Sequence, residues 1–346
     1  MRILQVTPRY PPHAGGVETH VSELAERMVA RGHEVTVFAA DAGGDVSRRE
    51  TRNSVDVRRF RGFAPGGAFH VAPGVVRAVR RANPDVVHAH NYHSLPAFFA
   101  ALGAGARTRL VVTPHYHGGS ASGFRDRLLS LYRPLGGWAL RRADEVVAVS
   151  EWERDRLRED FGVSAAVIPN GLDVGRFEDA IPAERDRPYL LCVGRLEAYK
   201  GVQHAIRALD ALPEYDLLVA GLGDYREELE RAARDAGVAG RVEFLGFVAD
   251  EELPGLYAGA AAYLTLSAFE SYGMTVAESL AAGTPCVVRE AGALVDWADR
   301  GDCVGVSSVA PEAVARAARA AVGRDAPDAP LPTWDEVTER VLAAYE

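Results

Sequence analysis

The sequence predicts an α/β protein built from two doubly wound domains, each a largely parallel sheet with helices on both faces. Short apolar runs typical of buried strands alternate with amphipathic helical stretches along most of the chain. The alternation restarts after a polar segment that contains Pro182. The 346 residues are also too many for one ordinary domain of this class and enough for two.

The first half opens on a buried strand at 2–7 (RILQVT), followed by Gly15 and Gly16 and by a helical pattern over 17–30. Further strands are expected at 33–40, 55–60, 85–89, 109–113, 145–149 and 165–168, and further helices at 73–82, 95–103, 123–141 and 151–160.

The second half repeats this pattern and closes with an amphipathic helix over 333–345 that carries Trp334 and Tyr345. Its strands are expected at 189–194, 215–221, 241–246, 261–266 and 285–290, and its other helices at 200–211, 225–236, 250–258 and 274–282.

These elements divide the chain into an N-terminal domain over 1–173, a linker over 174–187, a C-terminal domain over 188–330 and a final segment over 331–346. Open α/β sheets bind ligands at the carboxyl ends of their strands. If the carboxyl ends of the two sheets face each other, two substrates can meet in a cleft between the domains, shielded from water.

Composition excludes several classes of protein. The net charge of −9 argues against a nucleic-acid partner. No apolar run is long enough to span a membrane, and the N-terminal residues lack the pattern of a signal peptide. The three cysteines are scattered without metal-like spacing, so we expect a reduced, cytoplasmic protein.

One lysine, Lys200, stands among 39 Lys and Arg residues. It lies with Arg195 in the loop Gly-Arg-Leu-Glu-Ala-Tyr-Lys-Gly (194–201), which follows a predicted strand. An arginine fork and a lysine point charge together suit a diphosphate and stabilise the charge that develops on it as a leaving group. Two exposed cations on a loop are the alternative interpretation.

Two further loop–helix junctions suit an anionic ligand. Gly15 and Gly16 precede the first helix, where glycines let a ligand approach the backbone closely. Glu270 and Glu278 flank a second helix start, where the backbone N–H groups of 272–275 are expected to point at an anion. A carboxylate such as Glu278 can accept hydrogen bonds from the two adjacent hydroxyls of a ribose.

Histidines gather at predicted strand ends in the first domain. His115 follows the strand over 109–113, where it can bind a sugar hydroxyl or remain structural. His88, His90 and His93 lie near a neighbouring strand end, but no matching carboxylate or cysteine set accompanies them. The sequence also has no Asp-x-Asp for the Mg²⁺ of a sugar nucleotide. We therefore expect no metal site and no metal requirement.

In their order, these motifs resemble the retaining glycosyltransferases of family 4, which have the GT-B fold of two Rossmann-like domains. The resemblance covers roughly positions 1–290 and rests on five matching pieces. They are Gly-Gly-x-Glu at 15–18, Thr-x-His at 113–115, Ile-Pro-Asn-Gly-Leu-Asp at 168–173, Gly-Arg-Leu…Lys-Gly at 194–201 and Glu-x7-Glu at 270–278.

The resemblance implies a nucleotide-sugar donor, with uracil the base on family frequency, and roles for individual residues. Arg195 and Lys200 would hold the diphosphate, Glu278 the ribose and Glu270 the donor sugar. The resemblance further implies that His115 lies beside the donor sugar and the acceptor, and that the final helix crosses back to the N-terminal domain. The remaining residues expected to bind substrate are Gly15, Gly16, Asn170, Phe247, Val248, Tyr272, Gly273, Met274 and Thr275; Tyr272 replaces the family's usual phenylalanine.

Three alternatives stay open at this point. A GT-B nucleotide-sugar epimerase would need an acid/base pair at the sugar, and a non-catalytic nucleotide-sugar-binding protein would not need the motif residues that are retained. The acceptor is a small molecule, a glycan or a lipid-linked molecule.

The third alternative is an enzyme that works at a membrane surface. The segment 124–142 carries five arginines among Leu, Tyr and Trp, which is typical of helices that lie on anionic lipid at the inner face of a membrane. An ordinary amphipathic helix is the other interpretation of this segment.

Overall fold

The computed structural model describes residues 1–41, 46–65, 69–118 and 123–346, with the side chains of 123–126 left out of the description. The chain forms two compact units. Met1–Gly171 and Trp334–Glu346 make up the first unit, and Leu172–Thr333 makes up the second. Each contains a parallel sheet covered by helices, so the predicted fold class is confirmed.

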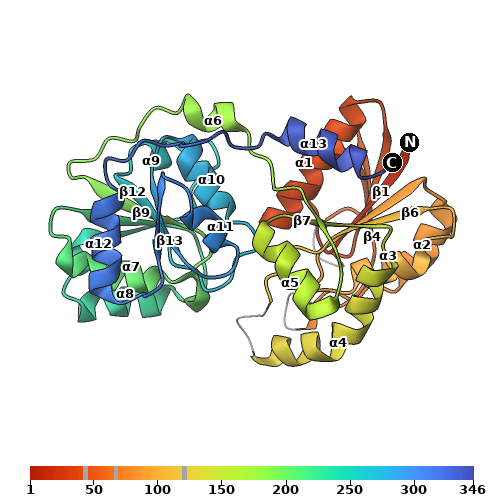
Figure 1. The fold of residues 1–346 in the computed structure, drawn as a ribbon, viewed down its shortest axis with the longest axis horizontal. Helices are drawn as coiled ribbons and strands as arrows, with labels where there is room; N and C mark the ends of the chain where they lie inside the picture. Colours follow the sequence, from red (N-terminus) through yellow and green to blue (C-terminus); the bar gives the residue numbers. More distant parts are fainter. Residues whose placement is uncertain (42–45, 66–68, 119–122) are drawn as a thin grey trace. The chain divides into compact units, whose positions relative to one another are not determined.

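The first unit is built on a sheet whose strands, within the described residues, follow the order β3-β4-β2-β1-β5-β6-β7-β8 (Figure 1). Its strands are β1 (Arg2–Thr7), β2 (Glu34–Ala39), β3 (Arg49–Arg52), β4 (Val55–Arg59), β5 (Val86–His90), β6 (Arg109–Thr113), β7 (Glu145–Ala148) and β8 (Ala166–Val167). All pairings are parallel except that between β3 and β4. The sequence analysis missed β3 because its RETR run is an exposed edge without apolar alternation.

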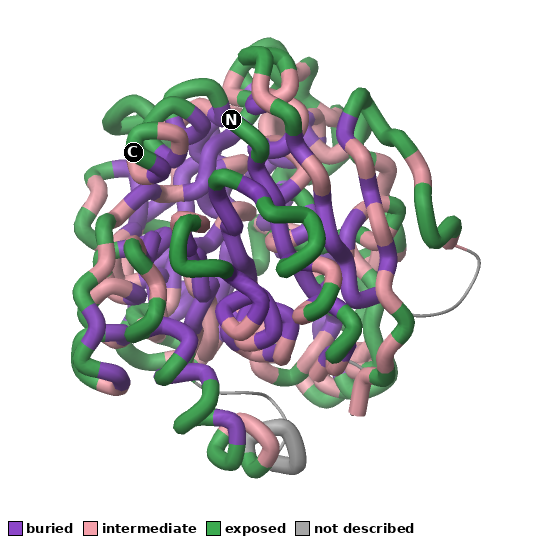
Figure 2. The backbone as a smooth tube through the Cα atoms, turned by 90° about the vertical axis from the view of Figure 1, so that its right-hand side faces the viewer, coloured by how far each residue is buried: buried purple, intermediate pink, exposed green. Residues whose placement is uncertain are grey.

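Side chains along each strand point alternately to the two faces of this sheet. Leu4 and Val6 of β1 belong to the core under α2, α3 and α4, whereas Gln5 points the other way and reaches Met28 of α1. The strands are accordingly buried along most of their length, and the turns are exposed (Figure 2). The helices of the unit are α1 (Gly16–Ala30), α2 (Gly74–Ala82), α3 (Pro96–Gly103), α4 (Gly123–Arg142), α5 (Glu151–Phe161) and α13 (Trp334–Ala343).

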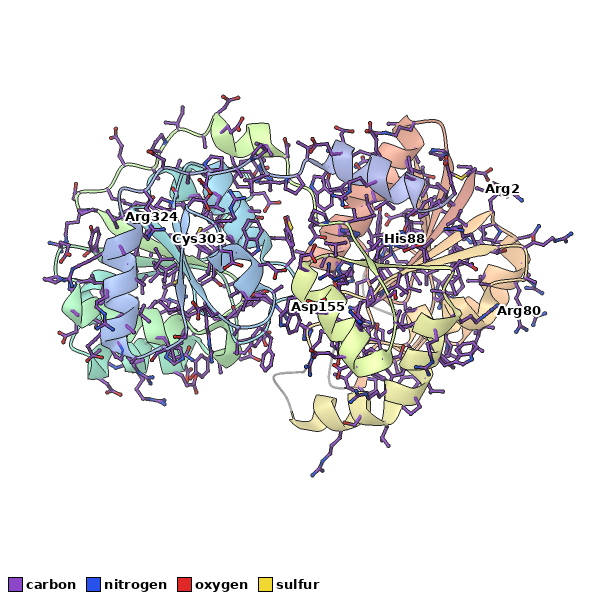
Figure 3. The ribbon with its side chains drawn as sticks, in the orientation of Figure 1. Arg2, Arg80, His88, Asp155, Cys303 and Arg324 are labelled. Carbon is purple, nitrogen blue, oxygen red and sulfur yellow. The ribbon has the colours of Figure 1, made fainter. Side chains whose placement is uncertain are left out.

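The last residues of the chain are tied to the first strand. Tyr345, just beyond α13, is buried, and its hydroxyl contacts His88 Nδ1 at 2.7 Å and the amide nitrogen of Gln5 at 3.2 Å. His88 lies in the interior of the unit, in contrast to the outward Arg80 (Figure 3). The segment Trp334–Glu346 therefore completes the core of the first unit although the whole second unit precedes it in the chain.

The second unit has a fully parallel sheet with the order β11-β10-β9-β12-β13-β14 among the described residues. Its strands are β9 (Tyr189–Val193), β10 (Asp216–Ala220), β11 (Val242–Gly246), β12 (Ala262–Thr265), β13 (Cys286–Arg289) and β14 (Cys303–Val306). No element was expected between 290 and the last helix, where the structure has β14, a short edge strand of four residues, and two helices, Leu294–Ala298 and Pro311–Ala321.

Helices cover both faces of this second sheet: α7, α8 and α12 pack as one group, and α6, α9 and α10 as another (Figure 1). The helices are α6 (Val174–Glu178), α7 (Val202–Ala208), α8 (Arg226–Asp235), α9 (Leu253–Ala258), α10 (Met274–Ala281), α11 (Leu294–Ala298) and α12 (Pro311–Ala321), with 3₁₀ turns η2 (Ala198–Lys200), η3 (Leu209–Ala211) and η4 (Ala239–Arg241).

Two segments differ from expectation. The single helix expected over 200–211 is three pieces. Gly201 separates η2 from α7 because its φ of +76° lies outside the helical region, and α7 is followed by the 3₁₀ turn η3 from Leu209. The expected linker over 174–187 begins with α6, whose Phe177 is buried and packs its ring on Tyr257, 6.1 Å between centroids. That part of the segment therefore belongs to the second unit.

No helix within the described residues has both the length and the apolar character needed to cross a membrane.

The Tyr345 hydroxyl gives a direct test of how the chain's end supports the fold. Tyr345→Phe leaves the buried His88 Nδ1 without its partner, and we expect a loss of about 1–3 kcal/mol in the free energy of unfolding. Tyr10→Phe is the matched control, because the Tyr10 hydroxyl is buried in the same unit without a hydrogen-bond partner among the described residues. Calorimetric melting of both variants checks this: equal melting temperatures would contradict the anchoring role.

Candidate active site

The second sheet reverses its strand order between β9 and β12. From β9 the chain moves outward to β10 and β11 on one side, and β12, β13 and β14 continue on the other. In open α/β sheets the carboxyl ends on the two sides of such a point form the ligand site. The loops that leave β9 and β12 here are 194–201 and 266–273, which hold the residues that the sequence analysis selected.

Glycine lets these two loops touch through their backbones. A Cβ atom on Gly201 would lie 2.2 Å from the carbonyl oxygen of Leu266, and the φ of +76° also favours glycine. Lys200, the residue before it, is therefore held beside the end of β12. Gly201 thus allows the close contact that places Lys200 beside the neighbouring loop.

Lys200 and Glu270 form an ion pair across the two loops. The Lys200 Nζ atom lies 2.6 Å from Glu270 Oε1, with 22% of the lysine side chain and 19% of the glutamate side chain exposed. Burial, the largest single influence, lowers the pKa of the Lys200 ammonium, but the attraction and hydrogen bond of Glu270 together with Tyr199 outweigh it, and the pKa is raised. The structure thus brings together two residues that are 70 positions apart in the sequence.

Arg195 lies at the outer side of the same loop. Its side chain is 68% exposed, pairs with Glu197 at 3.0 Å and donates to the Tyr199 hydroxyl at 3.0 Å. The ring of Tyr199 also lies 5.5 Å from Lys200 Nζ. Tyr199 therefore orients both cations, and the sequence analysis overlooked it although it stands next to the lysine.

The N-terminus of α10 opens onto the same region. Gly273 caps the helix with a φ of +102°, and a Cβ atom there would come within 3.1 Å of the Leu294 side chain. Thr275, in the first turn, accepts a hydrogen bond from the Tyr263 hydroxyl at 2.7 Å. A concavity in this unit is lined by Gly194, Arg195, Lys200, Ser267 and Thr275, among others.

Ser267 is a further site residue that sequence reasoning missed. Its hydroxyl is buried, lines that concavity and has no hydrogen-bond partner among the described residues. A buried hydroxyl without a partner is costly unless a ligand or solvent satisfies it. The sequence signal that could have identified Ser267 is its position two residues after β12, at the carboxyl end of a strand.

Glu278 lies one turn into α10, next to Met274 and Thr275 at the helix start. Its carboxylate accepts a hydrogen bond from the Tyr257 hydroxyl at 2.9 Å. Burial raises the pKa of Glu278, and this hydrogen bond opposes the shift. A carboxylate held by one tyrosine retains acceptor capacity for further hydroxyl groups.

Tyr272 contributes through packing rather than through its hydroxyl. Its ring is buried against Trp297, 5.3 Å between centroids, and its carbonyl oxygen accepts the Trp297 indole N–H at 2.6 Å. The side chain therefore fixes the turn before α10. Any direct contribution to a ligand comes from the backbone of this turn.

Exposed apolar side chains follow β10 and β11 at the same carboxyl edge. Phe247, which precedes Val248, is 74% exposed, and Leu222 is 58% exposed. The two loops are neighbours, since a Cβ atom on Gly246 would lie 3.9 Å from Leu222. An exposed apolar pair beside a cationic loop suits the planar base of a nucleotide, and the sequence analysis had not considered Leu222.

In the first unit, the order reverses between β1 and β5, and α1 begins at Gly16 beyond β1. Glu18 lies against this turn: its carboxylate would be 2.3 Å from a Cβ atom on Gly15, and it pairs with Arg9 at 2.7 Å. Apart from its chain neighbours and the backbone of its own helix, no atom of the described residues lies within 4 Å of the corresponding position on Gly16, so the backbone there is open.

His115 and Asn170 are both buried in the first unit. His115 has a φ of +47°, an uncommon conformation for a residue with a side chain and one that is enriched at functional sites. The side-chain oxygen of Asn170 makes no close hydrogen bond to a described residue, and the Asn170 side chain faces His20, whose pKa it raises. Both carry polar atoms that remain available inside the unit.

Two doubly wound units, one with a lysine–glutamate pair and an arginine at its switch point, define a GT-B transferase of activated sugars. The chain belongs to glycosyltransferase family 4. The model described as Glycosyltransferase Family 4 matches residues 14–176, and the model described as Glycosyl transferases group 1 matches residues 175–322. The protein is therefore a glycosyltransferase that uses a nucleotide-sugar donor.

Individual relatives and solved structures agree with this assignment. A glycogen synthase of Mycobacterium tuberculosis is 34% identical over 92% of this chain and 85% of its own length. A GDP-mannose-dependent phosphatidylinositol monomannoside mannosyltransferase of Mycolicibacterium smegmatis is 32% identical over 84% and 81%. HepE of Anabaena, solved with UDP and glucose, has the same fold with a TM-score of 0.78, at 20% identity over 99% of both chains.

The ion pair predicts the chemical reactivity of Lys200. Only the uncharged amine reacts with acylating reagents, so a raised pKa slows modification. Glu270→Gln removes the attraction, and we expect modification of Lys200 to speed up about tenfold for each unit by which its pKa falls. Peptide mass mapping gives the rate without ambiguity because the chain has no other lysine.

Glu197→Gln is the control for this reactivity, because it removes a carboxylate from Arg195 in the same loop and leaves the Lys200 pair intact. An unchanged rate in Glu270→Gln would show that the pair does not persist in solution.

Proposed function

We propose that the protein is a retaining, metal-independent glycosyltransferase that moves a sugar from a UDP-sugar to a hydroxyl acceptor. The observation that carries this proposal is the Lys200–Glu270 pair beside Arg195, at the switch point of the second sheet and in front of the N-terminus of α10. Two cations and a helix N-terminus supply the positive charge that a metal ion would otherwise bring to a diphosphate.

Each residue has a role in this proposal. Lys200 has three N–H groups, so it can keep Glu270 and still donate to a phosphate, while Arg195 donates from the other side. Glu278 accepts hydrogen bonds from the ribose, and Glu270 contacts the donor sugar. Phe247 and Val248 adjoin the base, Gly15 and Gly16 let the phosphates approach the first loop, and His115 and Asn170 serve the sugar and the acceptor.

We propose that the acceptor attacks from the face that the leaving group departs from, which retains the anomeric configuration. The acceptor oxygen forms the new bond to the anomeric carbon as the bond to the donor phosphate breaks, and a phosphate oxygen takes the acceptor's proton. The protein contributes orientation and stabilisation of the departing charge by Arg195 and Lys200.

A second candidate is transfer from GDP-mannose to a lipid acceptor, the activity for which the Mycolicibacterium smegmatis relative is named. One face of α4 favours it: Leu131, Leu135 and Trp138 are 77%, 44% and 39% exposed at positions one and two turns apart. Arg127 is exposed on the same helix, and Arg133 is half-exposed although it pairs with Asp160. Such a face suits an anionic membrane surface. Arg125, also part of this segment, lies outside the described side chains.

One experiment separates these candidates and tests the reaction itself. Purified protein is titrated with UDP, GDP, ADP and dTDP, and donor hydrolysis and transfer are measured with excess EDTA. We expect UDP to bind most tightly and turnover to survive chelation, because the cations of the loop over 194–201 replace the metal. Loss of turnover in EDTA that Mg²⁺ restores would refute metal independence.

Preference for GDP, together with binding to vesicles of phosphatidylinositol that Leu131→Asp abolishes, would select the second candidate. Tight nucleotide binding without any turnover would instead indicate a non-catalytic binding protein, and interconversion of the donor sugar would indicate an epimerase.

The two carboxylates should separate binding from turnover. Glu278→Ala removes the acceptor for the ribose hydroxyls, so we expect nucleoside diphosphate affinity to fall by roughly 1.5–3 kcal/mol. Glu270→Ala should leave that affinity closer to wild type and mainly lower turnover, because a nucleoside diphosphate lacks the sugar. Titration calorimetry and initial rates measure both quantities, and equal affinity of Glu278→Ala and the wild type would remove Glu278 from the ribose site.

A further inference from the structure

Three histidines from separate segments meet inside the first unit. They are His20 on α1, His90 at the end of β5 and His115 after β6. All three are buried, and their ring centroids are 4.9 Å (His20–His115), 5.4 Å (His20–His90) and 5.9 Å (His90–His115) apart. One ring nitrogen from each lies within 4.8 Å of the others.

Each of the three histidines has a ring nitrogen without a close hydrogen bond to a described residue. Within the part of the chain that the structure describes, Nδ1 of His90 and Nε2 of His115 are buried without a hydrogen bond. Neither ring nitrogen of His20 makes a close hydrogen bond, but the Asn170 side chain faces His20 as a hydrogen-bond partner and raises its pKa, so one His20 nitrogen remains for another ligand. Buried polar atoms in native proteins are nearly always paired, and leaving one unpaired costs free energy. Three buried imidazoles that each keep such a nitrogen, with ring nitrogens within 4.8 Å of one another, therefore indicate a ligand that all three can bind.

The network around His90 fixes which of its nitrogens carries the proton. The Gln5 amide nitrogen faces the Tyr345 hydroxyl at 3.2 Å, so the Gln5 oxygen is the atom that accepts from His90 Nε2, at 2.6 Å. His90 Nδ1 consequently offers a lone pair to the cluster. A histidine that donates one N–H to an oxygen and directs the other nitrogen inward has the arrangement typical of a metal ligand.

We propose that His20, His90 and His115 form a binding site for one divalent transition-metal ion, with Zn²⁺ the best match. Three imidazoles bound tetrahedrally at a Zn–N distance of about 2.0–2.1 Å have ring centres about 5 Å apart, close to the separations observed here. Burial lowers the pKa of all three histidines, to about 4 for His20, which keeps them in the neutral form that binds metals.

His88 is not part of the site, although it lies beside His90. Its Nδ1 contacts the Tyr345 hydroxyl and its Nε2 the Thr113 hydroxyl, both at 2.7 Å, so no nitrogen remains for an ion. Because Zn²⁺ takes four ligands, the three histidines leave a fourth position for an anion or water. An anion suits this position because neutral imidazoles do not compensate the charge of the ion.

The site would regulate the enzyme through His115. This step rests on the proposed function, in which His115 contacts the donor sugar or the acceptor. An ion that takes Nε2 of His115 withdraws that nitrogen from the substrate, so metal binding inhibits transfer. The enzyme would then need no metal for the reaction and would be inhibited by one.

The test uses the full chain and Co²⁺, whose tetrahedral complexes absorb visible light. We expect one Co²⁺ per chain with tetrahedral bands, displaced by Zn²⁺, and binding at least tenfold weaker in His20→Gln. His204→Gln is the matched control, because His204 lies in the second unit. X-ray absorption of the Zn²⁺-loaded wild type then counts its imidazole ligands without requiring any variant to fold; three are expected.

Transfer assays supply the second arm: Zn²⁺ should inhibit the wild type and His204→Gln at concentrations at least tenfold below those that inhibit His20→Gln. Equal Co²⁺ affinity in His20→Gln and the control, no tetrahedral bands, or fewer than three imidazoles on zinc would each overturn the site. Co²⁺ binding by a protein without transfer activity would refute the proposed function and leave the metal site standing.

Discussion

A parallel sheet sends all its strands in one direction, and the candidate site depends on this constraint. Every loop that leaves a carboxyl end does so at the same edge, so residues far apart in the sequence meet where the strand order reverses. In the second unit this geometry joins the loop after β9 to the loop after β12 and creates the Lys200–Glu270 pair. In the first unit the same geometry brings the ends of β5 and β6 together with α1, and with them three histidines.

The two sites differ in how burial affects the charge of their side chains. In the second unit a partly buried ammonium is balanced by a carboxylate, which maintains its positive charge. In the first unit burial removes the charge from the histidines and leaves lone pairs in an apolar interior. One environment suits an anion and the other a cation, although the same fold forms both.

Much of the fold was predictable because buried strands of a parallel sheet are apolar runs and the covering helices are amphipathic. The edge strand β3 was not, since Arg49–Arg52 carries little apolar signal, and β14 was not, since its apolar run is only four residues long. Arg195, Lys200, Glu270 and Glu278 stood out because the loops that hold them have distinctive residue patterns. Ser267, Leu222 and Tyr199 matter through what they face, which a sequence does not record.

The histidine cluster of the first unit could likewise be predicted only in part from the sequence. His88, His90 and His93 stand close together in the sequence, but no sequence pattern connects them with His20, which lies 70 positions before His90. His20 is on a helix that packs on the other side of β1 from α2 and α3. Strand alternation directs His88 and His90 to the face that α1 covers. Only the three-dimensional packing distinguishes His88, with both nitrogens bonded, from His90, with one available.

The discontinuous first unit also affects biosynthesis. Its closing segment, Trp334–Glu346, leaves the ribosome only after the whole of Leu172–Thr333 has been made. At about 5–20 residues per second, that delay is on the order of ten seconds. During this interval His88 and Gln5 lack Tyr345, and His20 lacks Trp334, whose ring packs 5.7 Å away in the finished protein. The first unit therefore exposes this part of its surface until synthesis is complete. A ribosome-associated chaperone would have the largest surface to protect during that interval.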